Sequence, residues 1–125
     1  MQKIRNACAL LLALPLIVFG GNDFVQLFEL PLGDQTAGEQ LLMTMREGGL
    51  MKVIASSHVL VGLFLLVPRL RFIGGLMQLP MSVGIVAFHG TMLPEGLPPA
   101  IGMLALNIGV VAERTRLGQL MGRWI

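Results

Sequence analysis

The amino-acid sequence predicts an all-α integral membrane protein, a four-helix bundle whose two termini both face the cytoplasm. Two observations predict this class. Charged residues make up 13% of the 125 positions, about half the share usual in a soluble domain, and 54% of the residues are apolar. The charges are also segregated along the chain, because seven of the nine Lys and Arg residues fall in three short clusters and six of the seven acids fall in the intervals between them.

The positions of the basic residues predict the number and direction of the crossings. Cytoplasmic loops of multi-pass proteins carry an excess of Lys and Arg. Four crossings place the three clusters inside and leave two basic residues, Arg46 and Lys52, outside. An odd number of crossings would leave one terminal cluster outside, so we expect four spans. The three clusters are Lys3/Arg5, Arg69/Arg71 and Arg114/Arg116/Arg123.

Four apolar runs delimit the spans of a single transmembrane domain, 1–125. Each run alone has about 15 to 17 residues, which is at or below the lower limit for a spanning helix. With their flanks, the helices are expected at about 4–24, 49–67, 70–89 and 98–114. The first run also fits a secretory signal peptide, since Lys3 and Arg5 precede it and Gly20 and Gly21 follow it. We expect an uncleaved first span.

The segments outside the spans carry two further helix signals. Thr36 and Glu39 form a capping-box pattern in the long first outer loop, which predicts an interfacial helix over the outer end of the bundle. A partly ordered loop is the alternative. The segment after the fourth span predicts an amphipathic tail on the cytoplasmic face, because apolar residues recur there at helical spacing. These residues are Leu117, Leu120, Met121 and Trp124.

Several functional classes are disfavoured by the composition. The only cysteine, Cys8, cannot form an internal disulfide, a CxxC redox pair or a thiolate zinc site. The pI is near 9.3, but the basic residues flank spans instead of forming a continuous patch, so nucleic-acid binding is not expected. No nucleophile motif, P-loop or dinucleotide fingerprint occurs. We therefore expect no catalytic activity of the chain on its own.

Three polar residues are predicted to lie near the middle of the membrane, where such side chains often mark function. His58 and Gln78 each lie ten positions from Pro68, so both are about 15 Å from the inner turn. Asn107 lies about 10 Å from the inner Glu113 by the same rise. Two interpretations remain open. The residues either join helices by hydrogen bonds worth on the order of 1 kcal/mol each, or form a pocket for a quinone-like head group or a proton-carrying His58.

A second candidate group is predicted at the outer rim. Asn22 and Asp23 end the first span, Glu29 follows, and His89 ends the third span. One histidine with carboxylates is a weak metal site, so no metal is predicted. His89 lies eleven residues beyond Gln78, about 16 Å along the membrane normal, so His58 and His89 are not expected to bind one haem.

A distinctive stretch in and after the third span reads Leu79-Pro80-Met81-Ser82-Val83-Gly84-Ile85-Val86-Ala87-Phe88-His89 and then Leu93-Pro94-Glu95-Gly96-Leu97-Pro98. It resembles the signature of DoxX-like small membrane proteins. The distinctive part is the Phe88-His89 pair with the turn that follows. The end of the first span, 18–24, and the second span, 61–69, are also similar to that family. The chain differs at His58 and Gly84, where the family often has an acid and an asparagine. The role of a buried acid in the family is therefore either lost in this chain or passed to His58.

The resemblance implies a four-span protein of the bacterial inner membrane. Some relatives are associated with thiosulfate or quinone oxidation and with thiol-redox partners. We therefore expect an accessory or membrane subunit of a redox or respiratory assembly, with quinone as a candidate cofactor and with lipid and other membrane subunits as partners. The alternatives are a small-molecule or proton carrier that uses the midplane polar residues, and a purely structural subunit of a larger complex.

Overall fold

The computed structural model describes residues 1–29 and 33–122, and these residues form helices without any strand. The all-α prediction is therefore confirmed for this part of the chain. Six α-helices and one short 3-10 helix follow one another. They are α1 (Gln2–Val25), α2 (Ala37–Glu47), α3 (Leu50–Leu66), α4 (Arg71–Thr91), η1 (Pro94–Gly96), α5 (Leu97–Val111) and α6 (Arg114–Gly122).

The helices have the length and composition of a membrane protein. Two of them, α1 and α4, are by themselves long and apolar enough to cross a membrane. The number rises to four if α2 with α3, and η1 and α5 with α6, are each counted as one bent span. The four long helices, α1, α3, α4 and α5, coincide closely with the four predicted spans. The chain thus has two to four candidate crossings.

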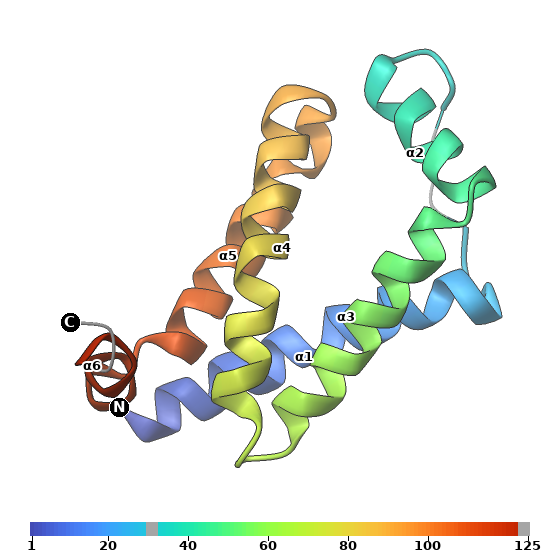
Figure 1. Cartoon of the computed structure of the whole chain (residues 1–125). Helices are drawn as coiled ribbons and strands as arrows, with labels where there is room; N and C mark the ends of the chain where they lie inside the picture. Colours follow the sequence, from blue (N-terminus) through green and yellow to red (C-terminus); the bar gives the residue numbers. More distant parts are fainter. Residues whose placement is uncertain (30–32, 123–125) are drawn as a thin grey trace.

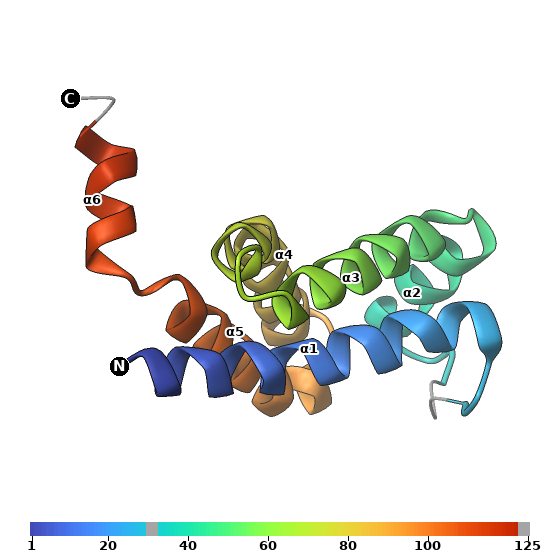
Figure 2. The ribbon, with the colours of Figure 1, turned by 90° about the horizontal axis from the view of Figure 1, so that it is seen from below.

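The four long helices are arranged as two close pairs. α1 packs along α3 and α4 packs along α5, while α1 with α5 and α3 with α4 join the pairs. α3 leans away from α4 above the turn that connects them (Figure 1). The same divergence is visible from below, where α3 follows α1 (Figure 2). Regular four-helix packing and the direction of the chain across a membrane therefore stay predictions.

Small residues allow the helices of each pair to approach closely. A Cβ on Gly20 of α1 would lie 2.9 Å from the carbonyl oxygen of Ala55 in α3. A Cβ on Gly75 of α4 would lie 2.8 Å from Val110 of α5. Close packing is the main source of helix association in a bilayer, because lipid is as apolar as the side chains. The fully buried large apolar side chains near the α1–α3 contact are Leu12, Leu16, Val61 and Leu65.

Large apolar side chains also point outward from every long helix. Leu14, Val53, Val83 and Ile101 are each 52–63% exposed. A soluble protein rarely shows contiguous apolar surface on this scale, whereas a bilayer solvates such side chains. The exposed surface therefore supports the assignment to a membrane.

The segment between α1 and α3, which we predicted to lie outside, contains the predicted helix, α2, and its capping box. The Thr36 hydroxyl accepts a hydrogen bond from the backbone N–H of Glu39 at 3.2 Å, and the Glu39 carboxylate accepts one from the N–H of Thr36 at 3.3 Å. Gly38 is buried against the carbonyl of Met92, which follows α4. α2 therefore contacts the end of the α4–α5 pair at which α4 ends. Its position at a membrane surface stays a prediction.

The predicted C-terminal tail is helical as α6. Leu120 and Met121 are exposed on it, as expected for a surface helix that can meet lipid. Trp124 and Arg123, which belong to the predicted tail, lie outside the described residues.

Neighbouring glycines of α1 test the close packing. We expect Gly20→Ala to lower the free energy of unfolding by about 1–3 kcal/mol, because a backbone carbonyl cannot move aside as a flexible side chain can. Gly21 has open space around its Cβ position. Gly21→Ala should therefore leave stability unchanged or raise it by up to about 1 kcal/mol through helix propensity. Reversible unfolding in mixed micelles measures both variants, and equal losses would contradict the α1–α3 contact.

Candidate functional site

Asn107 joins α4 to α5 in the interior. Its amide nitrogen donates to the carbonyl oxygen of Gly75 at 2.8 Å, and its side-chain oxygen accepts from the Ser82 hydroxyl at 2.8 Å. Asn107 and Ser82 are almost completely buried. Asn107 therefore joins two helices by hydrogen bonds, which is the first of the two roles considered from the sequence.

Gln78 lies on the same face of α4 and has no such partner. It is three residues after Gly75 and four before Ser82, which places all three on one side of the helix. The Gln78 side chain is fully buried. Both its amide nitrogen and its amide oxygen lack a hydrogen-bond partner among the described residues. An uncompensated buried amide costs roughly 2–7 kcal/mol. The described residues supply no polar partner that would offset this cost for Gln78.

His58 lies in a different interface, between α1 and α3. A Cβ added to Gly20 of α1 would lie 3.3 Å from the Cβ of His58. The Nε2 atom of His58 is buried and, among the described residues, unpaired. Asp23, at the end of α1, is near enough to interact with the imidazole electrostatically. No hydrogen bond links His58, Gln78 and Asn107 to one another within the part of the chain that the structure describes.

Three of the four predicted rim residues line one pocket of about 470 Å³ beside the ends of α1, α2 and α3. The side chain of Asn22 donates to the Phe28 carbonyl at 2.9 Å and accepts from the Phe28 N–H at 3.0 Å, which closes the loop after α1. Asp23 and Glu29 face the same pocket as Arg46 and Lys52, so acids and bases balance within it. The remaining lining residues are Gln26, Phe28, Met43 and Met51.

His89, the fourth predicted rim residue, lies apart from this pocket. Its Nδ1 atom is 3.0 Å from the Leu93 carbonyl oxygen, and its ring packs over Gly96 in the turn between α4 and α5. The histidine therefore holds this turn. Within residues 1–29 and 33–122, no three His, Cys, Asp or Glu side chains come together as a possible metal site.

Sequence reasoning identified the polar residues of the interior but not all of their partners. The Gly75 carbonyl that binds Asn107 is a backbone group, and the letters of the sequence give no signal for it. The sequence does carry a signal for the pairing of Ser82 with Asn107. Both are polar residues in apolar runs, and both lie at similar depth in adjacent antiparallel helices.

Comparison with known proteins adds no relative. No protein-family model matches the chain, and no curated protein or solved structure matches it. The resemblance to DoxX-like proteins therefore rests on the residues quoted above.

The Asn107 contacts predict a loss of stability on substitution. Asn107→Leu should lower the free energy of unfolding by about 1–2 kcal/mol, because it removes two hydrogen bonds between the helices and leaves the buried Ser82 hydroxyl without its partner on α5. Ser57→Ala is the matched control, since the Ser57 hydroxyl bonds only to its own helix, at the Val53 carbonyl. The control should change stability by less than about 0.5 kcal/mol. Unfolding in bicelles measures both, and no loss for Asn107→Leu would refute the interhelical role.

Proposed function

We propose that this chain is a membrane subunit of a redox or respiratory assembly and that its interior receives the polar head group of a quinone-like molecule. The observation that carries this proposal is that buried polar atoms of Gln78 and His58 have no hydrogen-bond partner among the described residues. We also propose that the protein lies in the inner membrane of a bacterium. The family resemblance supports this location.

The cost of the unsatisfied atoms is the physical reason for the proposal. Water is scarce at membrane depth, so each unpaired polar group costs several kcal/mol there. The amide of Asn107, by contrast, is hydrogen-bonded within the protein, to Ser82 and to the Gly75 carbonyl. Gln78 is equally buried, yet both of its amide atoms are left without a partner among the described residues. A bound polar molecule would offset that cost.

The residues present fit a quinone head group chemically. The Gln78 amide can donate to a quinone carbonyl oxygen or accept from a quinol hydroxyl, and the His58 Nε2 atom can do either, depending on its tautomer. When bound, a quinone supplies two-electron redox chemistry, which no side chain of this polypeptide carries. Its apolar tail would lie along the exposed apolar faces of the helices. Gln78 would then bind and orient the head group, and the helices around it would keep water away.

The redox partners in this proposal would be other membrane subunits that exchange electrons with the bound molecule. The resemblance of 79–98 to DoxX-like proteins supports such an assembly, because some of those proteins are associated with quinone oxidation. The exposed apolar surface on every long helix leaves room for lipid and for neighbouring subunits.

A proton carrier is the second candidate, and one observation favours it. Asp23 lines the pocket beside the end of α1, and it lies three residues after Gly20, which packs against His58, so both are on one side of α1. Two proton-binding groups therefore lie in sequence from the surface toward the middle of the protein. In liposomes with a pH-sensitive dye inside, this candidate predicts proton flux that both Asp23→Asn and His58→Leu abolish. Gln78→Leu should leave that flux unchanged.

The quinone proposal predicts opposite effects of one substitution on stability and binding. Gln78→Leu should raise the stability of the ligand-free protein by about 1–3 kcal/mol, because it removes an unsatisfied buried amide. The same substitution should weaken binding of decylubiquinone by at least about ten-fold, since a hydrogen bond to the head group is lost. Unfolding and titration calorimetry in lipid nanodiscs measure the two quantities.

Gln119→Leu is the matched control, because Gln119 is exposed on α6. It should leave both the stability and the binding of decylubiquinone unchanged. A stability loss in Gln78→Leu without any change in binding would contradict the proposal. That result would favour the purely structural subunit.

A further inference from the structure

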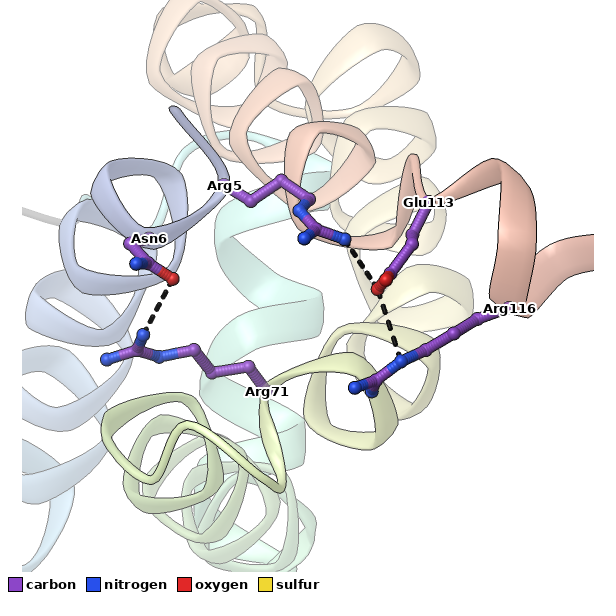
Figure 3. Close-up of polar contacts among 5 residues, drawn as sticks. All are labelled: Arg5, Asn6, Arg71, Glu113 and Arg116. Carbon is purple, nitrogen blue, oxygen red and sulfur yellow. Dashed lines mark hydrogen bonds and ion pairs between the residues drawn. The ribbon is translucent and has the colours of Figure 1, made fainter. Parts of the chain in front are cut away.

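A second pocket lies at the opposite end of the molecule from the rim pocket and has a volume of about 180 Å³. This is well above the roughly 10–15 Å³ that one water requires. Three arginines line it, and each comes from a different one of the three basic clusters in the sequence: Arg5 from α1, Arg71 from α4 and Arg116 from α6. Figure 3 shows Arg5 and Arg116 on either side of Glu113, and Arg71 turned toward Asn6. The other lining residues are Gln2, Pro68, Phe72 and Val110.

The pocket carries excess positive charge. Three arginines and one glutamate give +3 and −1, a net charge of +2 among the lining residues. Arg5 and Arg116 both bind the same oxygen of Glu113, Arg116 through its Nε atom at 3.2 Å. Each guanidinium has five N–H donors, so a single carboxylate cannot satisfy them. The pocket therefore retains donors for a second anion.

Two of the arginines are held in place by contacts that do not use up their charge. Arg71 donates through Nε to the Leu65 carbonyl at 2.8 Å and through one terminal nitrogen to the Asn6 side-chain oxygen at 2.8 Å. The Arg116 guanidinium carbon lies 5.5 Å from the centre of the Phe72 ring. Neutral partners orient a guanidinium without neutralising its charge. Because these side chains are ordered before an anion arrives, binding costs less conformational entropy.

The position of the pocket matches the level of phospholipid head groups. It lies where α1 and α4 begin and α5 ends, and α6 turns away from α5 beside it (Figure 2). Val67 and Ile73, close to the pocket in sequence, are 45% and 49% exposed, as expected where a helix enters hydrocarbon. Basic pockets between helices at this level bind anionic head groups. Guanidinium groups match phosphate oxygens in pairs.

We propose that the pocket formed by Arg5, Arg71, Arg116 and Glu113 binds a phosphate group, and that its source is the head group of an anionic phospholipid. The site is separate from the interior residues Gln78 and His58, so it does not depend on quinone binding. Glu113 limits the affinity, because it competes with the phosphate for Arg5 and Arg116.

The test is native mass spectrometry of the full chain in neutral detergent, titrated with phosphatidylglycerol. Arg116→Gln should weaken binding by about ten-fold, through loss of a charge-assisted contact. Glu113→Gln should tighten binding, because it frees two guanidinium groups. The matched control is Arg69→Gln, since Arg69 is exposed two residues from Arg71 and does not line the pocket. The control should stay within about two-fold of the original chain.

A parallel titration with inorganic phosphate distinguishes the source. Phosphatidylglycerol binding with the expected order of variants supports the lipid head group. Binding of inorganic phosphate alone, with the same order of variants, supports the phosphate site but assigns it to a soluble molecule. The proposal is overturned if Arg116→Gln and Arg69→Gln reduce binding equally, or if Glu113→Gln weakens it. Circular dichroism confirms that each variant stays helical.

Discussion

Hydrocarbon supplies no hydrogen bonds and does not solvate charge, so each polar group of a membrane-spanning chain needs a partner or a place at an end. The charged residues that line the two pockets are divided accordingly. Arg5, Arg71, Glu113 and Arg116 gather at one end, and Asp23, Glu29, Arg46 and Lys52 gather at the other. Between these ends, the interior holds few of the described polar side chains. Some are hydrogen-bonded between helices, and others have no partner among the described residues.

The same constraint explains why the helices were predictable. Charge at the ends of each apolar run limits how far a helix can extend through the membrane, so the runs and their flanks gave helix bounds close to those of the structure. The capping box at Thr36 and Glu39 is local chemistry, and it identified the start of α2 directly. Glycines such as Gly20 and Gly75 allow close helix packing, but their contact partners depend on the rotation of each helix.

Depth counted in residues from Pro68 does not give the rotation of each helix about its own axis. Counting residues from Pro68 places His58 and Gln78 at equal depth, yet the structure has them in different interfaces. A rise of 1.5 Å per residue gives height and carries no information on which neighbour a side chain faces. The contact between Arg71 and Asn6, 65 positions apart, illustrates the same limit. The basic clusters were predicted to share one side of the membrane, whereas their convergence on one pocket required the structure.

Accessibility of single cysteines most directly tests the claim that four crossings underlie this arrangement. With Cys8→Ala as background, an impermeant maleimide is added to intact cells that express Gln35→Cys, Pro68→Cys, Thr91→Cys or Gln119→Cys, all at exposed positions. We predict labelling from outside at positions 35 and 91, and labelling at 68 and 119 only after the membrane is permeabilised. Labelling from outside at position 68, or at positions 35 and 119 together, would contradict four crossings with both ends inside.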